Sequence, residues 1–133
     1  MTDQHAASYG DALTIPFWDA ASRHELIMQR CENCGHYQFY PRPFCLECES
    51  GDVSWTPVSG KGHVYSQTTV HINVLPDLTP PYTVVLVALD EGPRVLGAML
   101  SEESKIGDRV QVAWKEREDA PPLPSFEVIA HEA

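Results

Sequence analysis

The chain has 133 residues, 43% of them apolar, and its nine basic and nineteen acidic residues give a net charge of −10. This length fits one domain or two small modules, and no apolar run is long enough to cross a membrane. Such an acidic surface repels nucleic-acid phosphates and offers no basic stripe to anionic lipids, so we expect neither partner.

The N-terminal part of the chain predicts a flexible tail followed by a short helix. Residues 1–14 are polar and lack an apolar period, which is typical of a loose segment. Thr14 is a suitable N-cap, and residues 16–24 carry apolar side chains at helical spacing. Phe17 and Trp18 are the large apolar residues of this helix. They either pack it onto the domain or cover a surface for a partner or ligand.

The only four cysteines form two C-x2-C pairs, Cys31/Cys34 and Cys45/Cys48, with ten residues between the pairs. Each such turn points two thiolates at one ion, and two turns complete the tetrahedral four-sulfur shell that zinc prefers. Gly35 suits the turn after the first pair, where a positive φ is often needed. Four thiolates leave no open coordination position, so the pattern predicts a closed, structural zinc site.

Three other interpretations of the four cysteines stay open. Two disulfides are possible, but we see no secretory signal, so we expect a cytoplasmic protein with reduced thiols. A thioredoxin-like redox pair would leave the second C-x2-C unexplained. Iron uses the same four-thiolate ligand set and is the nearest rival to zinc. One colourless zinc ion per chain would distinguish zinc from iron.

Short strands flank the cysteine pairs. The pattern predicts strands over residues 25–30, 36–40 and 53–58, and the last of these carries Trp55. A sheet of this size buries too little apolar surface to be stable alone. We therefore expect the ion to supply the missing stability, with an apparent binding free energy of order 10 kcal/mol or more.

The second half of the chain predicts a small β-barrel. A hinge-like break at residues 59–62 precedes a long strand with alternating side chains up to residue 72. Eleven prolines and eight glycines fit many turns between short strands. Further strands are expected over residues 82–89, 94–99, 109–115 and 125–129. Five strands with a long, coiled first strand favour a closed barrel of the OB type, and an open sandwich is the alternative.

A proline-rich loop, residues 75–81, separates the first two barrel strands. Leu75, Leu78 and Tyr82 form a possible exposed apolar patch of the kind that marks a protein partner. In the other interpretation these side chains fold back over the open end of the barrel.

Nearly the whole chain, residues 15–129, resembles the DUF35 family of acyl-CoA-associated proteins. The resemblance is carried by the segments FWDAASRHELIMQRCENCGH, YPRPFCLEC, SGKGHVYSQTTVH, PPYTVVLVALDEGPRVLG, IGDRVQVAW and LPSF. It implies a mainly β protein with an N-terminal helix, a rubredoxin-like zinc ribbon and a five-stranded OB-fold domain. The helix and ribbon would occupy residues 15–58 and the OB-fold domain residues 59–130.

The resemblance also implies a function. Similar proteins are partner subunits of thiolase-fold enzymes of lipid and steroid metabolism: acyl transferases, condensing enzymes, and aldolases that cleave steroid acyl-CoA side chains. The thiolase-like subunit holds the reactive residues, and the small protein completes the acyl-CoA site. We therefore expect a hetero-oligomer that shares an acyl-CoA thioester with its partner and has no catalytic residue of its own.

A CoA thioester needs cations for its phosphates and an apolar slot for its pantetheine arm. Lys61, between two glycines, is the strongest cationic candidate. Each basic residue is also open to the simpler interpretation of a solvated charge or an ion pair with one of the nineteen acids. The full candidate set comprises the cations Lys61, Arg42 and Arg94 and the aromatic residues Phe17, Trp18 and Tyr40.

Two other classes of function remain as alternatives. A nucleic-acid-binding protein with an OB-fold and zinc ribbon would want a basic groove with aromatic platforms, which the charge of −10 disfavours. A stand-alone thioesterase or acyl transferase would have to work through histidine and carboxylate. The sequence has no G-x-S-x-G, phosphate loop or G-x-G-x-x-G, and we expect His36, His63 and His71 to have structural or surface roles.

Overall fold

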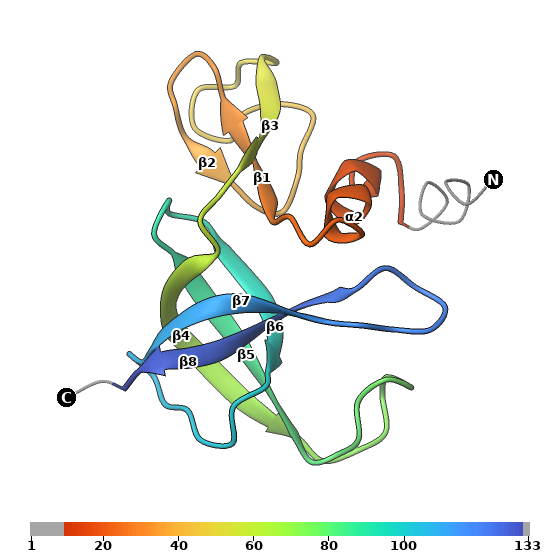
Figure 1. Cartoon of the computed structure of the whole chain (residues 1–133). Helices are drawn as coiled ribbons and strands as arrows, with labels where there is room; N and C mark the ends of the chain where they lie inside the picture. The colour runs from red at the N-terminus through yellow and green to blue at the C-terminus, as the bar shows by residue number, and fades with distance from the viewer. Residues whose placement is uncertain (1–9, 132–133) are drawn as a thin grey trace.

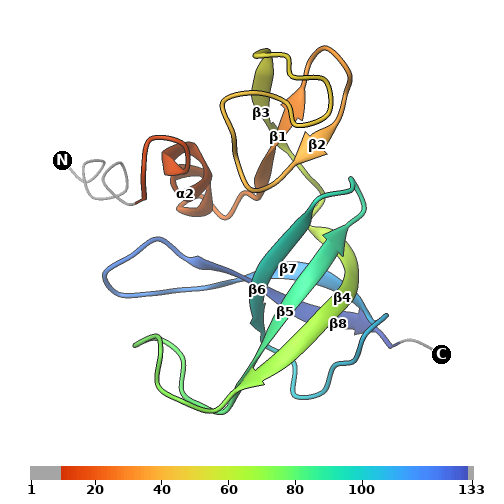
Figure 2. The same ribbon diagram turned by 180° about the vertical axis from the view of Figure 1, so that it is seen from behind.

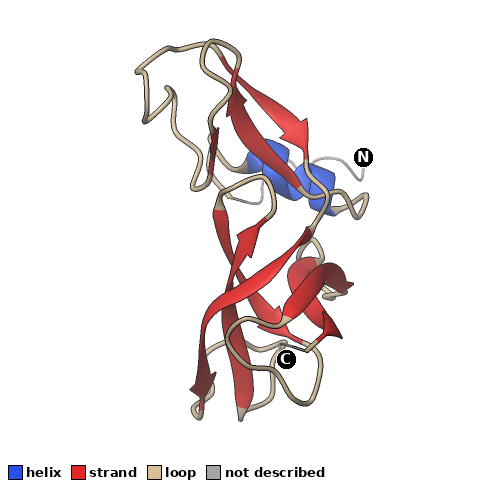
Figure 3. Cartoon of the chain, turned by 90° about the vertical axis from the view of Figure 1, so that its left-hand side faces the viewer, coloured by secondary structure: helices blue, strands red, loops and turns tan. Residues whose placement is uncertain are grey.

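The structure is a computed structural model that describes residues 10–131, so the first nine residues of the expected tail lie outside it. A small sheet stands on a barrel, and one helix lies beside the junction (Figures 1 and 3). Within the described residues, no helix is long and apolar enough to span a bilayer. The elements are α2 (Ile15–Ala21), β1 (Ile27–Cys31), β2 (Tyr37–Gln38), β3 (Val53–Pro57), β4 (Lys61–Val70), β5 (Tyr82–Leu89), β6 (Arg94–Met99), β7 (Arg109–Lys115) and β8 (Leu123–Ala130).

The predicted helix is present as α2, but it ends at Ala21, three residues before the predicted end. His24 adopts a left-handed backbone with φ of 60°, and the chain turns there toward β1. Pro16 lies in the first turn, where its missing N–H leaves no helical hydrogen bond unmade. Thr14 is the N-cap residue, but its side chain caps no helical amide. Its own N–H instead donates to the Asp11 carboxylate at 3.0 Å.

The small sheet has the antiparallel order β2-β1-β3 and carries the first cysteine pair at the end of β1. All three strands lie within a few residues of their predicted positions. Strand β2 has only two residues, because the chain leaves the sheet after Gln38 to form the loop that leads to the second cysteine pair. A sheet this short has little cross-strand pairing of its own.

The five remaining strands form a closed barrel in the order β4-β5-β6-β8-β7, which confirms the predicted OB-fold and excludes the open sandwich (Figures 1 and 2). Strand β4 closes it, because its first residues pair with β7 while its whole length pairs with β5. A bulge between Val64 and Ser66 bends β4. All pairings are antiparallel except β6 with β8.

One apolar core joins the small sheet to the barrel. Phe17 of α2 and the fully buried Met28 of β1 belong to the same cluster as Val64, Val110 and Phe126 of the barrel. The expected domain boundary falls in the connector 58–60, between β3 and β4. Because the core crosses this connector, we expect the two parts to unfold together.

Residues 59–62, the expected hinge-like break, are held in place by neighbouring strands. Residues 59 and 60 belong to the connector before β4, and residues 61 and 62 begin that strand. The Ser59 N–H donates to Glu91 Oε2 at 2.9 Å, and the Val112 N–H donates to the Gly60 carbonyl at 2.7 Å. Gly60 has φ of 78°, and a Cβ there would lie 2.5 Å from Val112 Cγ1. Glycine is therefore required at this position by both backbone conformation and close packing.

Candidate metal centre and ligand-binding residues

The two cysteine turns have the same backbone design. In the first, the Gly35 N–H donates to the Cys31 carbonyl at 2.8 Å, and Gly35 has φ of 81°. In the second, the Glu49 N–H donates to the Cys45 carbonyl at 2.9 Å, and Glu49 has φ of 68°. Both turns thus need a left-handed residue directly after the second cysteine, and only the first supplies a glycine.

Substitutions at these two turn positions are expected to change stability in opposite directions. Gly35→Ala puts a Cβ on a left-handed residue and should lower the free energy of unfolding by about 1 kcal/mol. Glu49→Gly removes the same strain and should raise it by up to about 1 kcal/mol. Urea denaturation of the zinc-loaded proteins measures both changes. A clear loss of stability in Glu49→Gly would contradict this account of the second turn.

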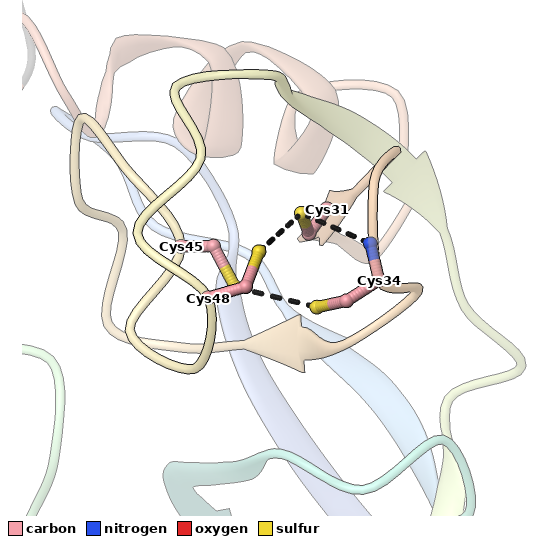
Figure 4. A group of neighbouring side chains, drawn as sticks. All are labelled: Cys31, Cys34, Cys45 and Cys48. Atoms are coloured by element: carbon pink, nitrogen blue, oxygen red, sulfur yellow. Dashed lines mark hydrogen bonds between the residues drawn. The ribbon is translucent and has the colours of Figure 1, made fainter.

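The four thiols converge on one point between the turns (Figure 4). Their sulfur atoms all lie within 4.8 Å of one another, with Cys31–Cys48 and Cys34–Cys45 separations of 3.6 Å. None is joined in a disulfide. Zn–S bonds of about 2.3 Å in a tetrahedron place sulfurs roughly 3.8 Å apart, so the arrangement fits a four-thiolate zinc ion.

The surroundings of two of the thiols change their pKa values in opposite directions. The Asn33 side-chain amide donates to Cys48 Sγ at 3.5 Å, and this bond, followed by the Ser50 backbone N–H, lowers the pKa of Cys48 to about 6. The backbone N–H of His36 lowers the pKa of Cys34, but burial and the neighbouring thiols outweigh it and raise that pKa to about 12. Four adjacent thiols resist joint ionisation, and a divalent cation would supply the compensating charge.

Two buried glutamines hold the loop of the second cysteine pair, and sequence reasoning missed them. Gln29 of β1 and Gln38 of β2 are register partners, and Gln38 Nε2 donates to Gln29 Oε1 at 2.9 Å. Gln29 Oε1 also accepts from the Arg42 N–H, and Gln38 bonds the Phe44 carbonyl and the Leu46 N–H. A polar residue inside the apolar strand IMQRC was the available signal.

Four of the predicted ligand-binding residues lie near the junction of helix and ribbon. Phe17 is 4% exposed. Its ring packs edge-on against Trp18, with ring centres 5.1 Å apart, and lies tilted against Phe39, with ring centres 5.3 Å apart. Tyr40 is exposed, and Arg42 Cζ lies 5.6 Å from its ring centre. A ligand would reach Tyr40 and Arg42 directly, whereas contact with Phe17 would require displacement of α2.

The other two, Lys61 and Arg94, lie on the outer wall of the barrel. His63 of β4 pairs with Arg109 of β7 on one side and with Ala88 of β5 on the other. Ala88 in turn pairs with Arg94 of β6, so these basic residues lie in one row across four strands. Arg94 Cζ stacks 4.0 Å from the ring centre of Tyr65. In Figures 1 and 2 the turn between β5 and β6 and helix α2 lie on opposite sides of the base of the ribbon. The six candidates therefore form two separate groups.

We call the basic residues on this side of the barrel, Lys61, His63, Arg94 and Arg109, the basic wall. Two acids, Asp90 and Glu91, lie in the turn beside it. The Arg109 guanidinium donates to both Asp90 oxygens at 2.7 and 2.6 Å, and this contact, helped by the charges of His63 and Lys61, lowers the pKa of Asp90 below its ordinary 3.8. The lowered pKa means that the ion pair stabilises the fold above pH 4 and that this contribution disappears as acid protonates folded Asp90.

Asp90→Asn should therefore have a lower melting temperature than the wild type at pH 7. The difference should shrink as the pH falls below 4, because the wild-type carboxylate is then protonated as well. Melting curves between pH 7 and pH 2.5 measure both proteins. A difference that does not change with pH would show that the carboxylate charge contributes nothing.

Two family models match the chain in succession. The model described as the rubredoxin-like zinc ribbon domain of ChsH2 matches residues 18–54, and the one described as the C-terminal OB-fold domain of ChsH2 matches residues 55–115. The matches cover the cysteine turns and most of the barrel. They agree with the ribbon and closed barrel that the structure contains.

Curated proteins and a solved structure are similar over most of the chain. A Methanocaldococcus jannaschii protein named "DUF35 domain-containing scaffold protein" is 30% identical over 111 residues, 79% of each chain. A Thermomonospora curvata protein named "Probable enoyl-CoA hydratase alpha subunit" is 34% identical over 83% of this chain, which spans only 36% of that relative's length. A chain of the solved "Ltp2-ChsH2(DUF35) aldolase" superposes with a TM-score of 0.82, 30% identity, and coverage of 90% of this chain and 97% of that one.

Proposed function

Since the chain belongs to the DUF35 family, with a ChsH2-type zinc ribbon and OB-fold, we propose that it is a non-catalytic subunit of an acyl-CoA enzyme. It binds a thiolase-fold partner and completes that partner's acyl-CoA site. The partner carries the reactive residues of an acyl transferase, a condensing enzyme or a steroid side-chain aldolase. The family resemblance supplies these enzyme classes.

The likeness to the Ltp2-ChsH2(DUF35) aldolase carries this proposal. The name of that aldolase joins a DUF35 protein to a second component, Ltp2, and the present chain matches nearly all of the similar chain. The name "scaffold protein" of the archaeal relative supports an assembly role as well. The four thiols are committed to a metal in this proposal, which leaves no cysteine as a nucleophile.

The metal centre has a structural role in the proposal. Cys31, Cys34, Cys45 and Cys48 hold one zinc ion and fix the loop between the two turns. Four sulfur ligands fill the coordination shell, so the ion binds no substrate. Residues 15–21 of α2 cover the acyl-CoA channel in this proposal, and the junction of ribbon and barrel faces the partner.

The acyl-CoA thioester is shared with the partner subunit. The basic wall with Lys61 and Arg94 contacts its phosphates, while Tyr40 and Arg42 beside the ribbon provide a second contact surface that Trp18 and Phe17 back. In this proposal the partner subunit completes the site between the two groups.

Lys61→Ala tests the phosphate contact in the assembled complex. Loss of one charged hydrogen bond should weaken acyl-CoA binding by about tenfold, measured by calorimetry with the complex. Lys105→Ala is the control, because Lys105 is also an exposed lysine, on the segment between two other barrel strands, β6 and β7. Equal affinity of wild type and Lys61→Ala would remove Lys61 from the site.

Co-purification tests the partner. A tagged chain expressed in its native host should retain a thiolase-fold protein at fixed stoichiometry, identified by mass spectrometry. The pair should turn over an acyl-CoA thioester, and the chain alone should not. A monodisperse chain that consumes thioester without a companion would instead favour the stand-alone thioesterase.

A further inference from the structure

The outer wall of the barrel carries an apolar hollow beside the loop between β4 and β5. Val85 and Val87 of β5 and Val95 of β6 point into the barrel and are buried, so the alternate residues of these strands face outward. Residues of the loop lie against this outward face and enclose about 130 Å³. The main lining residues are Leu75, Leu78, Val84, Leu96, Ala98 and Leu123.

This hollow remains open to solvent. Leu96 of β6 is 62% exposed and Leu75 of the loop is 43% exposed, although both are apolar. Two residues of the predicted apolar patch, Leu75 and Leu78, line this hollow, whereas the third, Tyr82, does not. The loop lies along the wall of the barrel instead of over its end. The enclosed space suits one side chain of leucine or phenylalanine size, the kind of anchor that dominates binding energy in protein interfaces.

A second hollow of about 450 Å³ adjoins the first and shares Leu75 with it. It lies between the β4–β5 loop and the β7–β8 loop, which project from the same side of the barrel in Figures 1 and 2. Its lining includes the carboxylates of Asp77, Glu118 and Asp119. An apolar pocket is therefore followed directly by an acidic one.

Among the described residues, Arg117 is the one basic residue that lines the second hollow, and its side chain contacts the β7–β8 loop and helix α2. Arg117 Nε donates to the Pro121 carbonyl at 2.7 Å, and Arg117 Cζ lies 5.4 Å from the centre of the Trp18 ring. With three carboxylates against this one guanidinium, the hollow has a negative balance. The chain as a whole also carries −10, so a cationic ligand is favoured at this site.

We infer that the two hollows form one docking surface for a segment of a partner protein that presents an apolar side chain next to lysine or arginine. The apolar side chain enters the pocket at Leu96, and the basic residue meets Asp77 and Glu118. This inference rests on the proposed function and locates the contact with the partner subunit. A second copy of the acidic chain and the anionic head of a CoA thioester both fit the charge less well.

Peptides test the surface without the natural partner. Amide shifts of the ¹⁵N-labelled full chain are followed during titration with acetylated and amidated KKLFKK, EELFEE and KKSSKK. KKLFKK should shift the amides of residues 75–78, 96–98 and 118–120 with a dissociation constant in the low millimolar range or tighter, roughly that of one anchor. EELFEE and KKSSKK should bind at least about tenfold more weakly, because each lacks one of the two features.

Other patterns of shifts would overturn the inference. Equal binding of EELFEE would remove the charge argument, and shifts elsewhere on the chain would remove the site. Shifts of the same amides on simple concentration of the protein would identify a second copy as the occupant. Stronger binding of butyryl-CoA than of KKLFKK at these amides would identify an acyl chain instead.

A matched pair of variants extends the test to the complex. Leu96→Asp and Ile106→Asp change residues that are both 62% exposed, so neither should perturb folding, but only Leu96 lines the pocket. Leu96→Asp should abolish the KKLFKK shifts and lower affinity for the co-purified subunit by about tenfold or more, and Ile106→Asp should do neither. Equal affinity of both variants for that subunit would contradict the docking surface. If no subunit co-purifies with the chain, the proposed function is wrong, and the peptide titrations alone test the docking surface.

Discussion

Cys45→Ser is expected to abolish stoichiometric zinc binding and to lower the free energy of unfolding by several kcal/mol, on the order of 5. Cys45 is fully buried and its sulfur lies 3.6 Å from that of Cys34, so a serine hydroxyl there replaces one of four converging thiolates. A hydroxyl is a poor zinc ligand at neutral pH, and the three remaining sulfurs leave an incomplete shell.

The large effect follows from the size of the ribbon. Strand β2 has two residues and β1 and β3 have five each, so the sheet forms few cross-strand pairs. Few side-chain contacts besides those of Gln29, Gln38 and Asn33 tie the second cysteine loop to the rest of the ribbon, so the expected ion is needed to fix it. Without the ion, few interactions compensate for the conformational entropy that the loop loses when it becomes ordered.

The barrel should lose stability together with the ribbon. Met28 of β1 is fully buried in the cluster that also contains Val64 and Phe126 of the barrel, so an unfolded ribbon uncovers part of that core. We therefore expect one cooperative transition at a lower temperature, not a melted ribbon beside an unchanged barrel. Calorimetry measures the transition, and metal analysis by mass spectrometry gives the zinc content of the same sample.

His36→Ala is the control for Cys45→Ser. His36 follows the first cysteine turn, but only its backbone is used there, through a 2.9 Å bond from the Cys31 N–H to its carbonyl. The variant should keep one zinc ion per chain and nearly the wild-type melting temperature. One tightly bound zinc in Cys45→Ser, or iron colour in the wild-type protein, would contradict the predicted zinc centre.

The sequence was most informative where local chemistry determines the structure. The cysteine spacing alone implied two matching turns around one ion. The bounds of β5, β6 and β7 coincide with the predicted ranges, because largely apolar runs lie between clear turn residues. The long first barrel strand favoured a closed barrel over an open sandwich, and the pairing of β4 with both β5 and β7 confirms closure.

Features that depend on contacts between distant residues were not predictable in the same way. The link between Gln29 and Gln38 needs the register of β1 with β2. The position of the β5–β6 turn and of helix α2 on opposite sides of the ribbon base needs the placement of the ribbon on the barrel. Residues 59–62 read as flexible because glycine is permissive. In the structure, neighbouring strands leave no room for a side chain at Gly60 or Gly62, which explains the glycine at each position.

Gly62→Ala is expected to destabilise the protein by about 3 kcal/mol or more. Gly62 pairs with Leu89 of β5 on one side and with Val110 of β7 on the other, so three strands meet at this residue. A Cβ on Gly62 would lie 2.2 Å from the Ala88 carbonyl oxygen and 2.9 Å from the Leu89 Cα. These are backbone atoms of a central strand, and they cannot move aside as the end of a flexible side chain does.

Relief of this clash requires β5 to shift away from β4, which breaks pairing at the point where the barrel closes. Urea denaturation with saturating zinc keeps the metal loading the same in all variants, so a change in the unfolding midpoint reports the effect of the substitution in the barrel. Gly51→Ala is the matched control, since an added Cβ there meets no atom within 4 Å and Gly51 has no positive φ, and its stability should stay within about 0.5 kcal/mol of the wild type. If Gly62→Ala unfolds at the same urea concentration as Gly51→Ala, close approach of the strands does not explain the glycine, and the flexible hinge becomes the better explanation.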